Sequence, residues 1–276
     1  MRALRDHLDV EEVSFPATSR LRTAYADVFW YPHLRTDADV LHCPTFRGPF
    51  RAPNLVVTVH DLAVLRHPEW FNRWTATYSR IAVPRVLRAA SRVIAVSEFT
   101  KRELLSFGVD ATVIPNAVED VFTSDGPRAE GDYVLAVGTL EPRKNLARIA
   151  QAVDGELRVV GARGWRGVEP PANVTWLGDV PDEELAKLYR GARCLVYASL
   201  YEGFGIPVAE ALACGCPVVT SIDSPMAELA PDAALVDPYD VDSIRDGIAR
   251  ATRIERHGPT WADVAAMTRA VYEELA

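Results

Sequence analysis

Residues 201–210 read YEGFGIPVAE, in which two glutamates, Glu202 and Glu210, bracket a glycine-rich turn. An apolar strand is expected before this turn, over residues 194–198, and a helix of small residues after it, over residues 207–214. Glycine lets a backbone approach a ligand closely, and Pro207 suits the first turn of a helix. Because free N–H groups at a helix start attract anions, the corner is a candidate anion site with both glutamates facing one crevice. A plain strand–turn–helix corner with two solvated glutamates is the alternative.

The composition excludes several classes of protein. The chain has 276 residues, of which 49% are hydrophobic and 25% charged, as in a globular protein of two domains. A formal net charge of −8 argues against a nucleic-acid partner. The sequence has no apolar run long enough to span a bilayer and no signal-peptide segment, so we expect a cytoplasmic protein.

The cysteine pattern predicts thiols rather than a metal site. Cys43, Cys194, Cys214 and Cys216 lie in apolar contexts, and the last two are too closely spaced for a usual zinc pair. We therefore expect four buried, reduced cysteines and no bound metal.

Short apolar segments alternate with helical patterns along the chain, which is typical of an α/β fold. In the first half, strands are expected over residues 10–15, 39–43, 55–59, 93–96 and 112–114, and helices over residues 71–90 and 98–106. In the second half, strands are expected over residues 133–137, 157–160, 174–177, 194–198, 218–220 and 234–236. Helices there are expected from residue 146 and over residues 183–190, 207–214, 241–252 and 261–275. Ser97 is the predicted N-cap of the helix that starts at residue 98, and residues 123–127 form a polar linker.

His60 and Asp61 follow the strand predicted over residues 55–59. Open α/β sheets bind ligands at the carboxyl ends of their parallel strands, so the pair is a candidate for a functional site. The structural alternative is that Asp61 caps the next segment and His60 is an ordinary core residue.

The predicted helix over residues 71–90 is rich in arginine. The arginines on it and just after it are Arg73, Arg80, Arg85, Arg88 and Arg92. An amphipathic helix with a solvated basic face is the default interpretation. The alternative is a contact with anionic lipid or a phosphate-bearing acceptor, which would place the protein at the inner face of the membrane.

The loop TLEPRKN, residues 139–145, places Arg143 and Lys144 between a predicted strand and a predicted helix. A helix start disfavours cations unless an anion is bound there. Arginine offers a fork of donors and lysine a point charge, so we interpret the pair as a clamp for a phosphate or diphosphate. An ordinary basic pair on the surface is the alternative.

Four segments occur in order: VHDL from Val59, VSEFTKREL from Val96, VGTLEPRKN from Val137 and YEGFGIPVAEALACGCPVV from Tyr201. Together they resemble the retaining glycosyltransferases of family 4, the glycosyl transferases group 1, and the resemblance covers nearly all of the chain after residue 13. It implies the GT-B fold, in which two Rossmann-like, doubly wound α/β domains face each other across a cleft. Residues 1–122 would form the acceptor-side domain and residues 128–256 the nucleotide-sugar domain, with a C-terminal helix over 257–276 crossing back to the first. The opening, RALRDHLDVEE, stands where the family has a strand, a glycine-rich loop and a helix, so we expect the N-terminal domain to be incomplete.

The same resemblance implies roles for residues of the donor site. Arg143 and Lys144 would bind the donor diphosphate, and Gly138 would admit the backbone close to it. Glu202 would hold hydroxyls of the transferred sugar, and Glu210 the ribose.

Further residues complete the implied site. The backbone around Gly203, Phe204 and Gly205 would contact sugar and phosphate, and the turn that ends at Val180 would read the nucleobase. His60 and Asp61 would line the sugar site from the N-terminal domain.

The activity implied by the resemblance is transfer of a hexose, as in mannosyl- or glucosyltransferases, from a GDP- or UDP-linked donor. The acceptor would be a glycan, a lipid or a small molecule, and the configuration would be retained. Fixed cations and a helix dipole would stabilise the leaving diphosphate, so no metal or other cofactor is expected. Two alternatives stay open: a GT-B nucleotide-sugar epimerase or phosphorylase, and a non-catalytic nucleotide-sugar-binding protein or inactive fragment.

Overall fold

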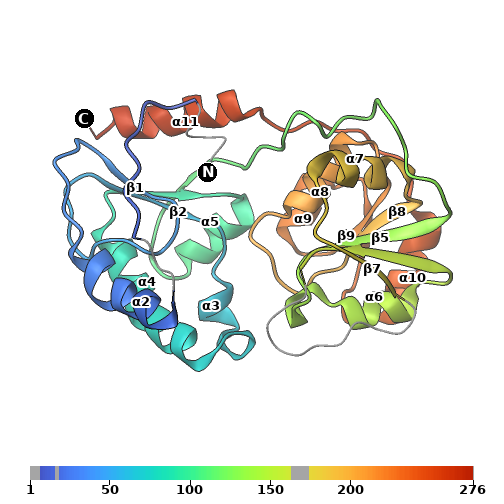
Figure 1. The fold of residues 1–276 in the computed structure, drawn as a ribbon, viewed down its shortest axis with the longest axis horizontal. Helices are drawn as coiled ribbons and strands as arrows, with labels where there is room; N and C mark the ends of the chain where they lie inside the picture. The colour runs from blue at the N-terminus through green and yellow to red at the C-terminus, as the bar shows by residue number, and fades with distance from the viewer. Residues whose placement is uncertain (1–6, 16–18, 163–173, 276) are drawn as a thin grey trace. The chain divides into compact units, whose positions relative to one another are not determined.

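The computed structural model describes residues 7–15, 19–162 and 174–275, which fall into two compact units. One unit joins Met1–Ala117 to Pro259–Ala276, and the other is Val118–Gly258 (Figure 1). The boundary after Ala117 precedes the one predicted at residue 122, because Val118, Val121 and Phe122 pack against the core of the second unit.

Four parallel strands form the sheet of the first unit, in the order β1-β2-β3-β4. They are β1 Leu41–Cys43, β2 Leu55–Val59, β3 Arg92–Ala95 and β4 Thr112–Val113. All of β2 is buried, as expected of a β-branched run in a parallel sheet covered on both faces. The strand predicted over residues 10–15 is wrong: this segment has no regular secondary structure, and Val10 and Val13 are 44% and 47% exposed. An apolar pattern forms a strand only where a neighbouring strand pairs its backbone groups.

The helical segments of the first unit are α2 Arg20–Tyr25, the π-helix η1 Ala26–Trp30, η2 Tyr31–His33, α3 Ala63–Arg66, η3 Pro68–Trp70, α4 Arg73–Ala89, α5 Glu98–Leu105 and α11 Trp261–Glu273. Ser97 caps α5, as predicted, by accepting a hydrogen bond from the Thr100 amide at 3.0 Å. The segments before α4 were not predicted, because they are too short for a helical period to be recognised.

Helix α11 belongs to the first unit, where Val264 and Val271 pack with Val56 of β2. His42 of β1 connects this helix to the sheet: its Nδ1 lies 2.5 Å from Tyr272 Oη and its Nε2 lies 2.8 Å from Thr58 Oγ1. Burial and the charge of His60 lower the pKa of His42 to about 4. The bridge between β1 and α11 is therefore a neutral imidazole at physiological pH.

Six parallel strands form the sheet of the second unit, in the order β10-β9-β8-β5-β6-β7. They are β5 Tyr133–Val137, β6 Glu156–Val160, β7 Val174–Gly178, β8 Cys194–Tyr197, β9 Val218–Ser221 and β10 Ala234–Val236. Counted from β5, this is the 3-2-1-4-5-6 order of a Rossmann sheet, read from the other edge. The direction of winding reverses between β5 and β8.

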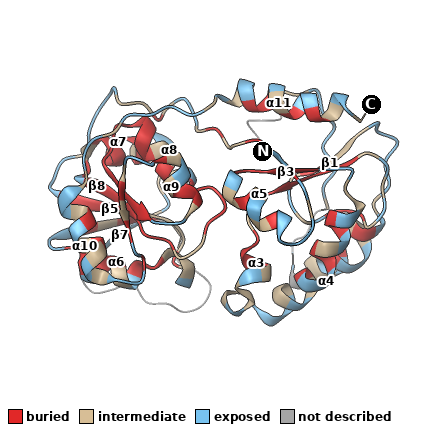
Figure 2. Cartoon of the chain, turned by 180° about the vertical axis from the view of Figure 1, so that it is seen from behind, coloured by how far each residue is buried: buried red, intermediate tan, exposed pale blue. Residues whose placement is uncertain are grey.

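The helices of the second unit are η4 Pro142–Lys144, α6 Leu146–Ala152, α7 Asp182–Gly191, α8 Ile206–Ala213, α9 Pro225–Leu229 and α10 Val241–Arg250. Helices α7, α8 and α9 cover one face of the sheet, and α6 and α10 cover the other (Figure 1). The strands between these layers are largely buried (Figure 2). The doubly wound α/β unit predicted for this half is confirmed.

Arg190 of α7 holds the predicted linker against the second unit. Its guanidinium, on a residue only 5% exposed, donates to the carbonyls of Thr123, Asp125 and Pro127 at 2.8–3.0 Å. Gly126, at φ 124°, brings its backbone close to the same guanidinium. The linker is thus an ordered part of the second unit.

All four cysteines are buried and free, as predicted. Burial raises the pKa of the Cys43 thiol to about 11 and that of Cys194 to about 12. The pKa values of Cys214 and Cys216 are raised for the same reason. In the described part of the chain, every helix is too short or too polar to cross a lipid bilayer.

Candidate functional site

The site lies at the carboxyl ends of β5 and β8, which pair as Val134↔Cys194 and Leu135↔Leu195. Winding reverses between these two strands, and open α/β sheets bind their ligands at such a point. Strand β5 leads into the TLEPRKN loop, and β8 leads into the YEGFG segment. The two motifs, about sixty residues apart in sequence, therefore meet at one edge of the sheet.

Asn145 shapes the TLEPRKN loop. Its backbone is left-handed, at φ 59°, and its side-chain amide donates to the carbonyls of Ala198 at 3.0 Å and Pro238 at 2.6 Å. The Leu200 amide also donates to the Arg143 carbonyl, at 2.8 Å. These bonds fasten η4 to the end of β8. Sequence reasoning missed Asn145, although asparagine tolerates a left-handed backbone before a helix.

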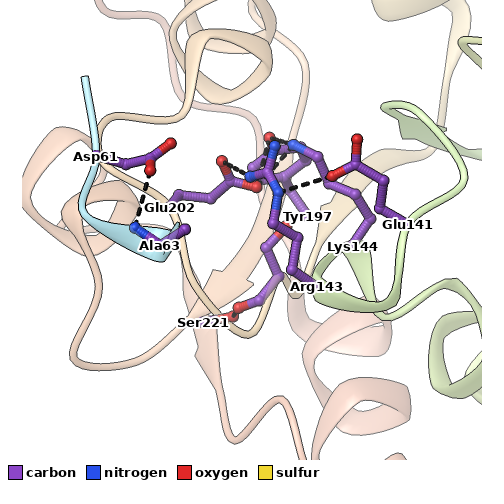
Figure 3. A network of polar contacts seen from close by, with 9 residues as sticks. Asp61, Ala63, Glu141, Arg143, Lys144, Tyr197, Glu202 and Ser221 are labelled. Carbon is purple, nitrogen blue, oxygen red and sulfur yellow. Dashed lines mark hydrogen bonds and ion pairs between the residues drawn. The ribbon is translucent and has the colours of Figure 1, made fainter. Parts of the chain in front are cut away.

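Glu202 lies between Arg143 and Lys144 (Figure 3). Arg143 Nη1 donates to Glu202 Oε2, and Lys144 Nζ donates to Oε1, both at 2.7 Å. The Glu202 side chain is 9% exposed, and those of Arg143 and Lys144 are 20% and 14% exposed. The sequence predicted all three as site residues, and the structure brings them into contact.

Tyr197 and Glu141 complete this cluster (Figure 3). Lys144 Nζ donates to Tyr197 Oη at 2.5 Å and lies 4.7 Å from the centre of its ring, and Tyr197 Oη donates to Glu202 Oε1 at 3.1 Å. Glu141 accepts from Arg143 Nε at 2.9 Å. Two cations and two carboxylates therefore balance in charge. Sequence reasoning missed both residues, although Tyr197 ends the strand that leads into the motif.

Burial and charge oppose each other in this cluster. Burial alone would raise the pKa of Glu202, but the charges of Lys144 and Arg143 outweigh it and hold that pKa below its usual value. Burial lowers the pKa of Lys144, and the charge of Glu202 opposes this shift. Burial and Glu202 together raise the pKa of Tyr197 well above its ordinary value, so its hydroxyl keeps the proton. The result is a buried ion cluster in which every charge has a partner.

Gly138 leaves room for Lys144. Its φ of 145° favours glycine, and a Cβ there would lie 3.1 Å from the lysine Cδ and Cε atoms. A small hollow at this edge is lined by residues that include Gly138, Thr139, Lys144 and Tyr197. The glycine therefore keeps the end of β5 open beside the lysine.

Glu210, on α8, has different surroundings. Its Oε2 accepts a hydrogen bond from Tyr189 Oη of α7 at 2.8 Å, and Tyr189 is completely buried. Burial raises the pKa of Glu210 to about 7, with a smaller raising effect from Asp182 and Glu119, while the Tyr189 hydrogen bond lowers it. The structure gives the two motif glutamates separate partners. Sequence reasoning missed Tyr189, whose contact links two helices.

Gly203, Phe204 and Gly205 connect Glu202 to α8, and all three are buried. Gly205 is the N-cap of α8 at φ 99°, and a Cβ there would lie 2.5 Å from Met226 Cγ. Val180 lies in the turn after β7 and packs, half-buried, against the core of the second unit. The ligand contacts expected of these residues stay predictions.

In the first unit, His60 and Asp61 follow β2. Asp61 Oδ1 accepts from the amide of Ala63, the first residue of α3, at 2.9 Å, while Leu62 occupies the N-cap position (Figure 3). The His60 side chain is exposed to solvent. Neighbouring protein atoms still remove part of its hydration, which lowers its pKa, and the charge of Asp61 opposes this shift. The site roles of both residues stay predictions.

Known proteins resemble the chain in both sequence and fold. Residues 119–261 match the family described as glycosyl transferases group 1, and residues 4–122 match glycosyltransferase family 4. The chain is 32% identical over 260 residues to O-antigen chain mannosyltransferase B of Escherichia coli, which covers 82% of this chain and 67% of that protein.

Two solved structures share the fold. Sucrose-phosphate synthase of Thermosynechococcus elongatus has a TM-score of 0.61 at 20% identity, over 92% of this chain and 76% of that one. Anabaena HepE in complex with UDP and glucose has a TM-score of 0.59 at 22% identity, over 81% of this chain and 67% of that one. The protein is therefore a glycosyltransferase with the GT-B fold. Within that class it belongs to family 4, the glycosyl transferases group 1, as its four motifs predicted.

Proposed function

We propose that this protein transfers a hexose, most simply mannose, from a nucleotide-diphosphate sugar to a glycan or glycolipid acceptor. The observation that carries the proposal is the pair of half-buried cations, Arg143 and Lys144, at the point of the sheet where winding reverses. Mannose is supported by the activity named for the Escherichia coli relative. The uridine or guanosine diphosphate of the donor is what the family resemblance of the sequence implies. The UDP and glucose bound to Anabaena HepE are consistent with such a donor.

The chemistry of transfer suits this cluster. As the bond between the anomeric carbon and the diphosphate oxygen breaks, negative charge grows on the diphosphate, and fixed cations stabilise it. The acceptor oxygen then bonds to the anomeric carbon on the face from which the diphosphate departs. The proton of the acceptor hydroxyl passes to the departing diphosphate oxygen. This front-face route retains the configuration. Because two side chains supply the positive charge, we expect turnover to persist in EDTA.

The other motif residues divide the donor between them. Glu202 would accept hydrogen bonds from sugar hydroxyls, and Glu210 from the ribose through Oε1, since Tyr189 occupies its Oε2. The backbone from Gly203 to Gly205 would contact sugar and phosphate. The turn ending at Val180 would contact the nucleobase, and His60 would act on the sugar from the first unit.

Donor binding and turnover test the proposal. Thermal-shift measurements with GDP, UDP, ADP and their sugars should select one nucleotide, and the purified protein should then consume that nucleotide sugar in the presence of an oligosaccharide or polyprenyl-linked acceptor. Arg143→Ala should weaken nucleoside diphosphate binding more than nucleoside monophosphate binding. Arg193 directly precedes β8, at the end of the strand far from the site. The control variant Arg193→Ala should leave the binding of both nucleotides unchanged. Binding without turnover by wild-type protein would instead favour a non-catalytic nucleotide-sugar-binding protein.

We also propose that α4 contacts an anionic membrane, where a lipid-linked acceptor would be found. Its exposed arginines are Arg73, Arg80, Arg85 and Arg88, and α4 contains no acidic residue. Trp74 and Ile81, about half exposed, lie two turns apart on the same helix. Basic and apolar side chains together on one helix surface suit the interface of an anionic bilayer.

A second exposed group supports this surface. Tyr78 Oη of α4 donates to the Asp27 carbonyl of η1 at 2.6 Å, which joins the two helices. Next to Asp27, Tyr25 and Phe29 are 55% and 58% exposed, and their rings contact each other.

Co-sedimentation with vesicles tests the membrane proposal. The protein should bind vesicles that contain phosphatidylglycerol and not vesicles of phosphatidylcholine alone, and Arg80→Gln/Arg88→Gln should reduce this binding. The matched control Arg193→Gln/Arg245→Gln removes the same charge from the second unit and should leave it unchanged. Equal binding to both kinds of vesicle would contradict the proposal.

A further inference from the structure

The cluster around Arg143 and Lys144 contains an anion of the protein itself, the Glu202 carboxylate. Glu202 accepts hydrogen bonds from both Arg143 and Lys144, each at 2.7 Å, and its side chain is 9% exposed. A diphosphate that binds the same cations therefore meets a carboxylate in the place where its own oxygens would lie. The two anions compete for one set of donors.

We infer that Glu202 is an internal counter-ion that makes the site select a sugar-bearing diphosphate over a free nucleoside diphosphate or pyrophosphate. This inference rests on the proposed function in one respect, namely that the ligand of Arg143 and Lys144 is the diphosphate of a sugar donor. It assigns Glu202 a role in rejecting ligands, in addition to any contact with sugar hydroxyls.

Several donors of the two cations are hydrogen-bonded to other side chains of the protein. Arg143 gives Nε to Glu141 and Nη1 to Glu202, and Lys144 gives two of its three N–H groups to Glu202 and Tyr197. A phosphate that binds these cations must share their donors with Glu202 or displace it. Displacement strips a buried carboxylate of both its cations, which is unfavourable in a poorly solvated site.

The Glu202 carboxylate is also held in position. Tyr197 Oη donates to its Oε1 at 3.1 Å, and the Leu200 amide ties the same segment to the Arg143 carbonyl at 2.8 Å. The carboxylate therefore stays beside the cations when a ligand enters and acts on that ligand's charge at short range, where screening by solvent is weak.

Sugar and bare phosphate differ in how they meet this carboxylate. A sugar brings hydroxyl groups that donate hydrogen bonds to it. A free nucleoside diphosphate instead presents a terminal phosphate that carries additional negative charge and is repelled. Selectivity thus comes from repulsion of the free nucleoside diphosphate by Glu202. The same repulsion favours release of the nucleoside diphosphate after transfer.

Calorimetric titration with inorganic pyrophosphate tests this role, because pyrophosphate reports on the phosphate subsite without a ribose or base. Glu202→Gln keeps the size of the side chain and removes its charge, and we expect it to bind pyrophosphate about tenfold more tightly than wild type. Inhibition by the free nucleoside diphosphate should become stronger in parallel. The titrations are made at both pH 6.5 and pH 8, so that an affinity change caused by loss of the Lys144 proton can be told apart from the effect of the Glu202 charge. A thermal melt establishes that the variant is folded.

Matched variants isolate the charge of Glu202. Glu202→Asp retains the charge and should not tighten pyrophosphate binding. Glu210→Gln changes the other motif glutamate and should leave pyrophosphate affinity unchanged. Arg143→Ala/Glu202→Gln should lose the gain of the single variant, because one of the two freed cations is gone.

Unchanged or weaker pyrophosphate binding by folded Glu202→Gln would overturn the inference. If that variant does not fold, the wild-type protein provides the test. It should bind the intact nucleotide sugar at least as tightly as the free nucleoside diphosphate, and tighter binding of the free nucleoside diphosphate would overturn the inference. Failure of the proposed function looks different, because wild-type protein would then turn over no nucleotide sugar, whether or not it binds one and whatever Glu202→Gln does with pyrophosphate.

Discussion

Glu202 and Glu210 belong to one motif, with seven residues between them, yet their surroundings differ. Glu202 contacts two cations, which hold its pKa below the usual value. Glu210 contacts the hydroxyl of Tyr189, and burial raises its pKa to about 7. Glu202 is buried with its charge paired, whereas Glu210 is half-buried in surroundings that disfavour its charged form.

The difference shows that neighbours, rather than the residue type, decide the charge of a buried carboxylate. Glu202 is ionised across the physiological range, whereas Glu210 is close to half-protonated at neutral pH. Ligand binding should therefore involve proton release at Glu210 and none at Glu202. Each of the following variants changes one side of this contrast.

Lys144→Met should have the largest effect, because it leaves Glu202 with Arg143 as its only cation. Removing one partner of a buried ion pair costs about 3 kcal/mol or more, so urea unfolding at pH 8 should show a loss of about 3 kcal/mol in unfolding free energy. The double variant Lys144→Met/Glu202→Gln should recover part of that loss. A double variant less stable than Lys144→Met would contradict the pairing.

Glu210→Gln should stabilise the protein at alkaline pH. A carboxyl whose folded pKa is raised from 4.5 to about 7 stabilises the fold fully below pH 4.5, and this contribution is lost as the pH rises through 7. Relative to the variant, wild type should lose about 2 to 3 kcal/mol of unfolding free energy between pH 5 and pH 8.

Glu184→Gln is the matched control for Glu210→Gln, since Glu184 is a half-exposed carboxylate on α7. The unfolding free energy of Glu184→Gln should change between pH 5 and pH 8 by the same amount as that of wild type. Parallel pH profiles for wild type and Glu210→Gln would mean that Glu210 titrates normally.

Tyr189→Phe should move the Glu210 titration and little else. The Tyr189 hydrogen bond lowers the pKa of Glu210, so without it that pKa should rise above its value of about 7. The pH dependence of urea unfolding, compared with Tyr189→Phe/Glu210→Gln, measures the shift. A midpoint that stays near pH 7 would show that the hydroxyl does not act on the carboxylate.

Tyr197→Phe should have the smallest effect. It removes the hydroxyl that contacts both Lys144 and Glu202, but the direct ion pair and the aromatic ring beneath the lysine remain. We expect a loss of about 1 kcal/mol in unfolding free energy at pH 8. A loss as large as that of Lys144→Met would mean that the tyrosine, rather than Glu202, is the main partner of the lysine.

The elements predicted best from the sequence are those with strong local signals. Strands β2 and β5 are apolar, β-branched runs and were predicted with the observed bounds, and Ser97 was recognised as a cap. The segment over residues 10–15 reads VEEVSF, with two glutamates between its valines, and it pairs with no strand in the described residues. Short helices such as α3 and α9 were missed because four or five residues do not establish a helical period.

The site was predicted residue by residue rather than as an arrangement. Arg143, Lys144 and Glu202 stood out because of their motifs, but their mutual pairing depends on β5 lying beside β8, which the order of elements along the chain does not fix. Tyr189 and Tyr197 carry no motif of their own. Their roles follow only from contacts made in the folded second unit.

The four buried cysteines make the protein convenient for chemical labelling. Maleimides react with the thiolate, which burial suppresses at Cys43, Cys194, Cys214 and Cys216. A cysteine introduced at an exposed position, such as Asp125→Cys in the linker or Thr77→Cys on α4, should therefore react selectively in the native background. Fluorescent or spin labels could then be attached to either unit of the folded enzyme without first replacing the natural thiols.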